Sequence, residues 1–138
     1  MSIIEQQKIR EKTYTEAMRY MDNAKEILKM AGKEGYYYND SKYVSTACGT
    51  AYKGVLIALD AYLKLKDIPA RKRKSIEYYT EHIGKIDRKL LRDVNIVYEI
   101  LHLSGYYDGI HDAIVVQRGM DIAFQIINKI KPTKQNDN

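Results

Sequence analysis

Two apolar stripes run along a single stretch of the chain, residues 43–63. One stripe consists of small residues and the other of larger apolar ones: Ala47, Ala51, Gly54, Ala58 and Ala61 in the first, and Val44, Cys48, Val55, Leu59 and Tyr62 in the second. Both advance in steps of three and four residues or their multiples, so each follows one side of an α-helix. A helix that is apolar on two sides needs cover on two sides, and small residues let a neighbouring backbone approach closely. The stretch therefore predicts the central helix of a bundle.

Length and composition favour one helical domain. The chain has 138 residues, of which only two are proline, and this length buries a core without metal or disulfide staples. Strand-like alternation is hard to find in the sequence. We expect an all-α bundle over residues 13–131, preceded by an arm or an extra helical turn at 1–12 and followed by a disordered polar tail at 132–138.

Helix signals divide the chain into five segments. Residues 13–16 (Thr-Tyr-Thr-Glu) form a capping-box pattern that starts the first helix. A loop over residues 32–40 precedes the central helix, and a third helix spans about 70–83. Asp87 can cap a fourth helix, which is interrupted at residues 104–109. The inner face of this fourth helix contains Leu90, Val94, Val97 and Leu101.

The last predicted helix, about residues 110–131, has an unusually wide apolar surface. Ile122 and Ile126 lie on a different side from the main apolar row, whose members are Ala113, Val116, Met120, Ala123, Ile127 and Ile130. A single contact would not cover both sides. We therefore expect the protein to form a homodimer.

The single cysteine and the lack of apolar spans bear on location. Cys48 is the only cysteine, which excludes an internal disulfide and suits a reducing compartment. It lies on an apolar helical face, as free cysteines that act as small hydrophobes do. No window approaches the roughly 18 apolar residues of a membrane span, and the first residues lack the features of a secretory signal. We expect a cytoplasmic protein that does not bind membranes.

The net charge of +5 is unevenly distributed along the sequence. Its densest cluster is Arg71, Lys72, Arg73 and Lys74, which is a candidate phosphate-binding site. The competing interpretation is a solvated helix start. Both alternatives stay open at this point.

Motifs for catalysis and metal binding are incomplete. Glu99 and His102 have the Glu-x-x-His spacing of di-iron bundles, but those sites require a second copy of the motif and two further glutamates. The sequence also lacks His-Glu-x-x-His, paired cysteines, a Gly-rich phosphate loop and Gly-x-Ser-x-Gly. We predict no metal site and no cofactor.

The thirteen tyrosines, against one phenylalanine and no tryptophan, are the most unusual compositional feature. Tyrosine suits half-buried seams, interfaces and platforms on which bases stack. The candidate ligand-binding residues are Tyr106, Tyr107, Asp108 and His111, which combine an aromatic pair, a carboxylate and an imidazole in one turn. The competing interpretation is that the tyrosines fill the boundary between core and water, and that Asp108 only caps the last helix.

The segments resemble the HEPN (higher eukaryotes and prokaryotes nucleotide-binding) superfamily over about residues 13–131. The resemblance rests on the alanine-rich first helix, the central helix at residues 45–63, the turn at 105–109 and the run at 120–124. It implies an up-and-down bundle of four to five helices that commonly dimerises. Active members are metal-independent ribonucleases with an Arg followed after four to six residues by His, and others partner a minimal nucleotidyltransferase.

The chain departs from the HEPN catalytic pattern. His102 lies ten residues after Arg92, and His82 lies nine after Arg73. No histidine has an arginine at the required spacing, so no catalytic role carries over. The leading hypothesis is a non-catalytic homodimeric binding module for a nucleotide, RNA or a partner protein. The alternative is a degenerate ribonuclease that uses Arg92 and His102 as cation and general base.

Overall fold

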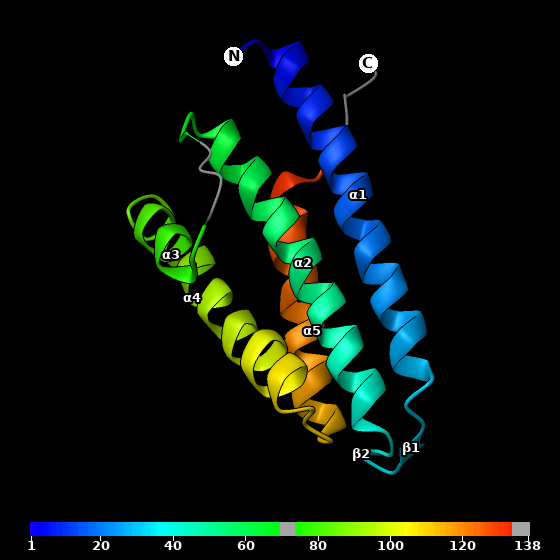
Figure 1. Cartoon of the computed structure of the whole chain (residues 1–138). Coiled ribbons are helices and arrows are strands. Elements are labelled where there is room, and N and C mark those ends of the chain that lie inside the picture. Colours follow the sequence, from blue (N-terminus) through cyan, green and yellow to red (C-terminus); the bar gives the residue numbers. More distant parts are fainter. Residues whose placement is uncertain (70–73, 134–138) are drawn as a thin grey trace.

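Helix α2 (Ser41–Leu65) is the central helix of the computed structural model, which describes residues 1–69 and 74–133. Both apolar stripes of its sequence are buried, as predicted. Helix α1 (Ile3–Lys29) packs along one side of α2, and α5 (Ala113–Ile127) lies behind them (Figure 1). The π-helical segment η1 (Tyr98–Tyr107) covers the other side of α2, and α4 (Arg88–Val97), which η1 continues, packs against α5. The expected all-α bundle is confirmed.

Shorter elements complete the bundle. Helix α3 (Ile76–Gly84) packs against α4, and the 3₁₀ turn η2 (Asn128–Ile130) extends α5. Strands β1 (Lys33–Glu34) and β2 (Tyr37–Tyr38) form an antiparallel ribbon between α1 and α2, with Lys33 opposite Tyr38. The sequence predicts a plain loop at residues 32–40, without this ribbon.

The start of α1 differs from the prediction. The helix begins at Ile3, and Ser2 caps it by accepting a hydrogen bond from the backbone N–H of Glu5. Residues 13–16 therefore lie inside the helix, and the predicted capping box there is wrong. Ala17 and Met21 of α1 are buried and therefore lie on its inner face. The physical reason is that Ser2, further upstream, can also cap a helix, and its hydroxyl accepts a hydrogen bond from one of the free backbone N–H groups at the helix start.

The fourth helix is longer than predicted. Asp87 caps α4 through the backbone N–H of Leu90, as expected. The interruption predicted at residues 104–109 starts later than expected, because η1 continues the helix to Tyr107 and only Asp108 and Gly109 of that range lie beyond it. The next helix, α5, begins at Ala113 rather than near 110, and Asp112 caps it instead of Asp108.

Helix α5 is covered more completely by its own chain than the sequence suggested. Ile122 and Ile126, which motivated the expected homodimer, are both buried within one chain. Contacts with α1, α2, α4 and η1 surround the helix and account for this burial. Ile114, in its first turn, is 60% exposed.

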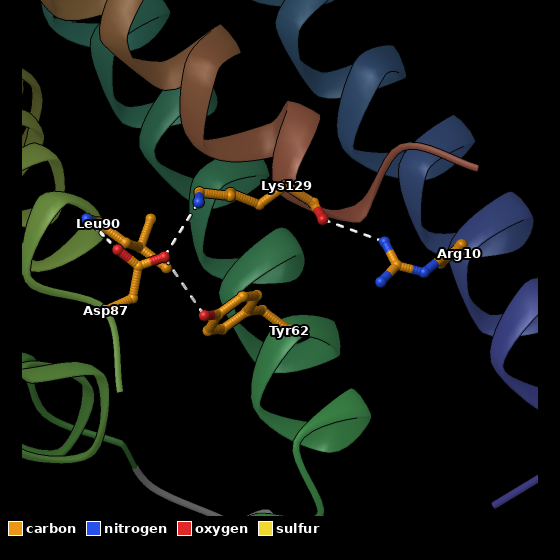
Figure 2. A network of polar contacts seen from close by, with 5 residues as sticks. All are labelled: Arg10, Tyr62, Asp87, Leu90 and Lys129. Atoms are coloured by element: carbon orange, nitrogen blue, oxygen red, sulfur yellow. Dashed lines mark hydrogen bonds and ion pairs between the residues drawn. The ribbon is translucent and has the colours of Figure 1, made fainter. Parts of the chain in front are cut away.

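A polar network fastens the end of the bundle (Figure 2). The Asp87 carboxylate accepts hydrogen bonds from the backbone N–H of Leu90 at 3.0 Å, from Lys129 Nζ at 3.0 Å and from the Tyr62 hydroxyl at 3.5 Å. Arg10 donates to the Lys129 carbonyl at 3.0 Å. The hydrogen bond from Leu90, together with the Lys129 ammonium, holds the pKa of Asp87 below its usual value. The network joins α1, α2, α4 and η2.

Two further predictions concern segments next to residues that the structure does not describe. Helix α3 begins at Ile76 with Ser75 as its cap, later than the predicted start near residue 70. The disordered tail predicted for residues 132–138 lies largely outside the described residues, which end at 133. Among residues 1–69 and 74–133, no helix is both long enough and apolar enough to cross a membrane.

Candidate functional site

Three aromatic side chains lie along one face of the π-helical segment η1. A π-helix closes its backbone hydrogen bonds at i+5 rather than i+4, so each turn contains more residues than an α-helical turn. Tyr98, His102 and Tyr106 are spaced four residues apart along η1, and the ring of His102 stacks on the rings of the other two. π-Helical turns are rare and are found frequently at functional sites. This stretch is the first structural pointer to a site.

The ring of His102 lies among four tyrosine rings. We call these five aromatic side chains the tyrosine–histidine cluster. The His102 ring stacks on Tyr52 of α2 with ring centroids 4.8 Å apart, on Tyr98 at 5.2 Å and on Tyr106 at 6.0 Å. Tyr107 meets it edge-on at 5.1 Å. These separations are within the range of favourable aromatic pairs, each of which contributes about 0.5–1.5 kcal/mol beyond burial.

Contacts with α2 hold the cluster in place. The Ser45 hydroxyl donates a hydrogen bond to the backbone carbonyl of Tyr106. A Cβ added at Gly49 would lie 2.7 Å from Cδ2 of Tyr106, so the glycine leaves the space that this ring occupies. A Cβ at Gly105 would lie 2.4 Å from the Cys48 sulfur. Two glycines on facing helices thus set how closely η1 approaches α2.

The cluster is uncharged near neutral pH. Burial lowers the pKa of His102, so its imidazole is neutral at pH 7. Burial, together with the nearby Tyr98, raises the pKa of Tyr52 to about 12. Tyr106 and Tyr107 are 46% and 68% exposed, respectively. The site therefore offers neutral aromatic faces to solvent.

A groove of about 710 Å³ borders the cluster on its α2 side. Tyr20 of α1, Thr46 and Lys53 of α2, and His102 and Tyr106 of η1 contribute to its lining. Lys53 Nζ lies 5.6 Å from the centroid of the Tyr20 ring and supplies a cation at the edge of the groove. Aromatic faces and a positive charge therefore line one open groove.

Of the four predicted ligand-binding residues, the structure places two in the tyrosine–histidine cluster and two outside it. Tyr106 and Tyr107 belong to the tyrosine–histidine cluster. Asp108 follows η1 and is exposed, and its backbone N–H donates to the Leu103 carbonyl. None of the side-chain contacts described for residues 1–69 and 74–133 involves the Asp108 carboxylate or links His111 to the cluster.

His111 instead fastens the ribbon to the start of α5. Its Nδ1 lies 2.6 Å from the Tyr38 carbonyl, and because a carbonyl only accepts, the imidazole donates this hydrogen bond. Its ring stacks on Tyr37 with centroids 5.4 Å apart. The backbone N–H of Tyr38 donates back to the His111 carbonyl at 2.8 Å. These contacts give His111 a structural role.

The alternative catalytic pair is not brought together within one chain. Arg92 is exposed on α4, and His102 lies ten residues further along the same continuous helical run. Ten residues correspond to roughly 15 Å along a helix axis. Within the described residues, no contact joins the two side chains, and no group of three or more His, Cys, Asp or Glu residues could hold a metal ion.

The predicted phosphate-binding cluster is described only at its last member. Arg71, Lys72 and Arg73 lie outside the described residues. Lys74 is largely buried and lies 3.4 Å from the Asp60 carboxylate. Asp60 also accepts a hydrogen bond from the Tyr79 hydroxyl at 2.7 Å. Lys74 is thus held in an ion pair.

Sequence reasoning missed three residues of the site, namely Tyr52, Tyr98 and Lys53. The i, i+4, i+8 spacing of Tyr98, His102 and Tyr106 was an available signal, because this spacing places side chains along one face of a helix. Tyr52 and Lys53 are close to the cluster through tertiary packing of α2, for which the sequence carries no local signal.

Comparisons with known proteins show the family of the chain without naming an activity. No curated protein matches it. A solved structure of a protein of unknown function from Dyadobacter fermentans is 43% identical, with a TM-score of 0.79 over 87% of this chain and 94% of that chain. Residues 12–132 match a domain of unknown function, DUF5618. The chain therefore belongs to the DUF5618 family.

Proposed function

We propose that this protein is a non-catalytic binding module for a nucleobase, presented by a nucleotide or by RNA, and that the base stacks on the tyrosine–histidine cluster. The observation that carries the proposal is the ring of His102 in contact with four tyrosine rings, two of them widely exposed. Stacking of a base on an aromatic side chain contributes about 1–3 kcal/mol and tolerates any base. Lys53, at the edge of the groove, supplies a charge for a phosphate.

The same geometry favours binding over cleavage. A metal-independent ribonuclease needs a general base and a cation at one phosphate. His102 is packed among tyrosine rings, and Arg92 lies several turns away on the same helical run. A binding module needs only aromatic and basic groups along a groove, as found here. The ribonuclease alternative gains no support from these positions.

The wider proposal includes kinship with the HEPN superfamily, a cytoplasmic location and a homodimer. A helical bundle and a single buried cysteine support the first two parts. Exposed Ile114 on α5 supports a second copy, although Ile122 and Ile126 do not need one. A partner of the nucleotidyltransferase type belongs to the same HEPN-based proposal. Light scattering of the purified protein tests the dimer, with twice the chain mass of 16.1 kDa expected.

Fluorescence anisotropy with a labelled single-stranded RNA of about ten nucleotides tests the function directly. We expect Tyr106→Ala to weaken binding about tenfold, because a loss of roughly 1.4 kcal/mol of stacking corresponds to that factor. Tyr36→Ala is the matched control, since Tyr36 is 74% exposed on the ribbon and outside the cluster. It should bind as tightly as the wild type.

Gel analysis of the same samples reports whether the RNA stays intact. Intact RNA, together with weaker binding by Tyr106→Ala alone, supports the proposal. Equal loss of binding in both variants, or binding that neither variant alters, contradicts it. RNA cleavage that is abolished by His102→Ala would replace it with the ribonuclease alternative.

A further inference from the structure

A second groove, distinct from the one beside the cluster, is strongly basic. It has a volume of about 520 Å³ and lies between the first half of α1 and the last half of α2. We call it the basic groove; its charged lining residues are Lys8, Lys12, Lys64, Lys74 and Asp60. Its lining thus contains four lysines and a single acidic residue. Such a concentration of one sign of charge attracts and holds polyanions.

The charge balance of the basic groove leaves three lysines for a ligand. Asp60 is already engaged by Lys74 and by the Tyr79 hydroxyl. In the part of the chain that the structure describes, no ion pair joins Lys8, Lys12 or Lys64 to an acidic side chain. The groove therefore carries an excess positive charge that its own carboxylate does not neutralise.

The basic groove continues the seam that begins at the cluster. Six of the residues of α2 that line the two grooves follow one another in helical steps of three or four: Thr46, Thr50, Lys53, Ile57, Asp60 and Lys64. Such a spacing places them on one face of the helix. On α1, Tyr20 lines the groove beside the cluster, and Thr13 lines the basic groove. Because α1 and α2 lie side by side (Figure 1), the two grooves follow one another along the same seam between these helices.

We propose that the path along this seam binds a single-stranded polynucleotide, with a base stacked on the tyrosine–histidine cluster and phosphates along the lysines of the basic groove. The proposal rests on the proposed function and extends it from one base to a strand. From Thr46 to Lys64, the path follows 18 residues of α2, or roughly 27 Å at the rise of an α-helix. At about 3.4 Å per nucleotide of a stacked strand, it accommodates about eight nucleotides.

Oligonucleotides of increasing length test this inference. The wild-type protein is titrated into labelled single-stranded RNA and DNA. The probes are about 2 to 12 nucleotides long, in steps of about two, so that they span the expected site size. We expect affinity to rise with length up to about eight nucleotides and then to level off. RNA and DNA share the phosphate and base chemistry, and a difference between them reports contacts with the 2′-hydroxyl.

Charge variants identify the lysines involved. In the double variant Lys12→Gln/Lys64→Gln, the slope of log affinity against log salt should become shallower by about 1.4, because each lost phosphate contact removes about 0.7 on a single strand. The control Lys33→Gln/Lys89→Gln removes the same charge from exposed positions outside both grooves. It should keep the wild-type slope.

The outcomes separate this inference from the proposed function. Affinity that is independent of length, or equal salt slopes in the two double variants, overturns the polynucleotide path. In that case, binding of short oligonucleotides that Tyr106→Ala weakens would leave the proposed function standing. If no oligonucleotide of any length binds, both proposals are overturned. An acidic protein partner is then the alternative occupant of the basic groove.

Discussion

His102 shows how one residue takes its properties from its neighbours. Its imidazole is half-buried among tyrosine rings, which offer no carboxylate to stabilise a positive charge. Burial therefore lowers its pKa. A neutral imidazole stacks as an aromatic ring and continues the surface formed by the tyrosines. Neutral His102 is thus part of the binding surface that we propose.

A pH titration of stability tests this environment. A histidine whose folded pKa lies below its unfolded value stabilises the fold above the unfolded pKa, near 6.5. That contribution is lost as the pH falls from the unfolded pKa through the lower folded one. We expect the melting temperature of the wild type to decrease more between pH 7.5 and pH 5 (a window set around the unfolded pKa of about 6.5) than that of His102→Gln. Circular dichroism measures both.

The control for this titration is His111→Gln, because His111 donates a hydrogen bond outside the cluster. It should retain the wild-type decrease, whatever its overall stability. An identical pH dependence in wild type and His102→Gln would contradict the environment assigned to His102.

The contact between α2 and η1 depends on glycine. An alanine Cβ at position 105 would lie 2.4 Å from the Cys48 sulfur and 2.6 Å from its Cβ, both buried. Either η1 or α2 would have to move. Overpacking of this kind costs about 1–3 kcal/mol, so we expect Gly105→Ala to lower the free energy of unfolding by about that amount in urea denaturation.

Gly49→Ala is the matched control on the same contact. Its Cβ meets the ring of Tyr106, which is partly exposed and can turn toward solvent. We expect a smaller loss of stability than for Gly105→Ala, together with weaker RNA binding. Wild-type stability of Gly105→Ala would contradict the close approach of these helices.

The N-terminal end of α4 depends on one carboxylate, that of Asp87, which has two roles. Asp87 caps α4 and also pairs with Lys129 of η2 at 3.0 Å (Figure 2). Asp87→Asn preserves a good cap but removes the ion pair, whereas Asp87→Ala removes both. We expect Asp87→Ala to be less stable than Asp87→Asn by about 1 kcal/mol, the usual contribution of a cap. Urea denaturation at pH 7 measures this difference.

The Asp87 carboxylate also makes the stability of the fold depend on pH in the acid range. The folded pKa of Asp87 is lowered, so its stabilising contribution is present above the unfolded pKa, near 3.8, and is lost as the pH falls through the folded pKa. Asp87→Asn should lose less stability than the wild type in this acid range. Parallel losses would show that the network in Figure 2 does not hold this end of the bundle.

Across the whole molecule, the sequence predicted the elements whose signals are local or periodic. The stripes of α2 and the cap at Asp87 are such signals, and both were read correctly. Only the last part of η1, residues 104–107, was not predicted as helix, because Gly105 normally marks a helix end. Here the glycine serves the close contact with Cys48.

Only part of the candidate site could be predicted from the sequence, because its residues come from different helices. Tyr106 and Tyr107 were identified from their unusual sequence, but His111 was grouped with them because it is nearby in the chain. The structure instead groups them with Tyr52 and His102, which packing of α2 against η1 brings together. A single sequence does not specify such tertiary neighbours.

The measurement that tests the central claim most directly is photochemical crosslinking of the wild-type protein to a single-stranded RNA that contains photoreactive uridines, followed by mass spectrometry of the linked peptides. The proposed stacking site predicts crosslinks at Tyr106 and Tyr107 of η1. Crosslinks confined to other surfaces, such as the ribbon around Tyr36 or the first turn of α5 at Ile114, would contradict it.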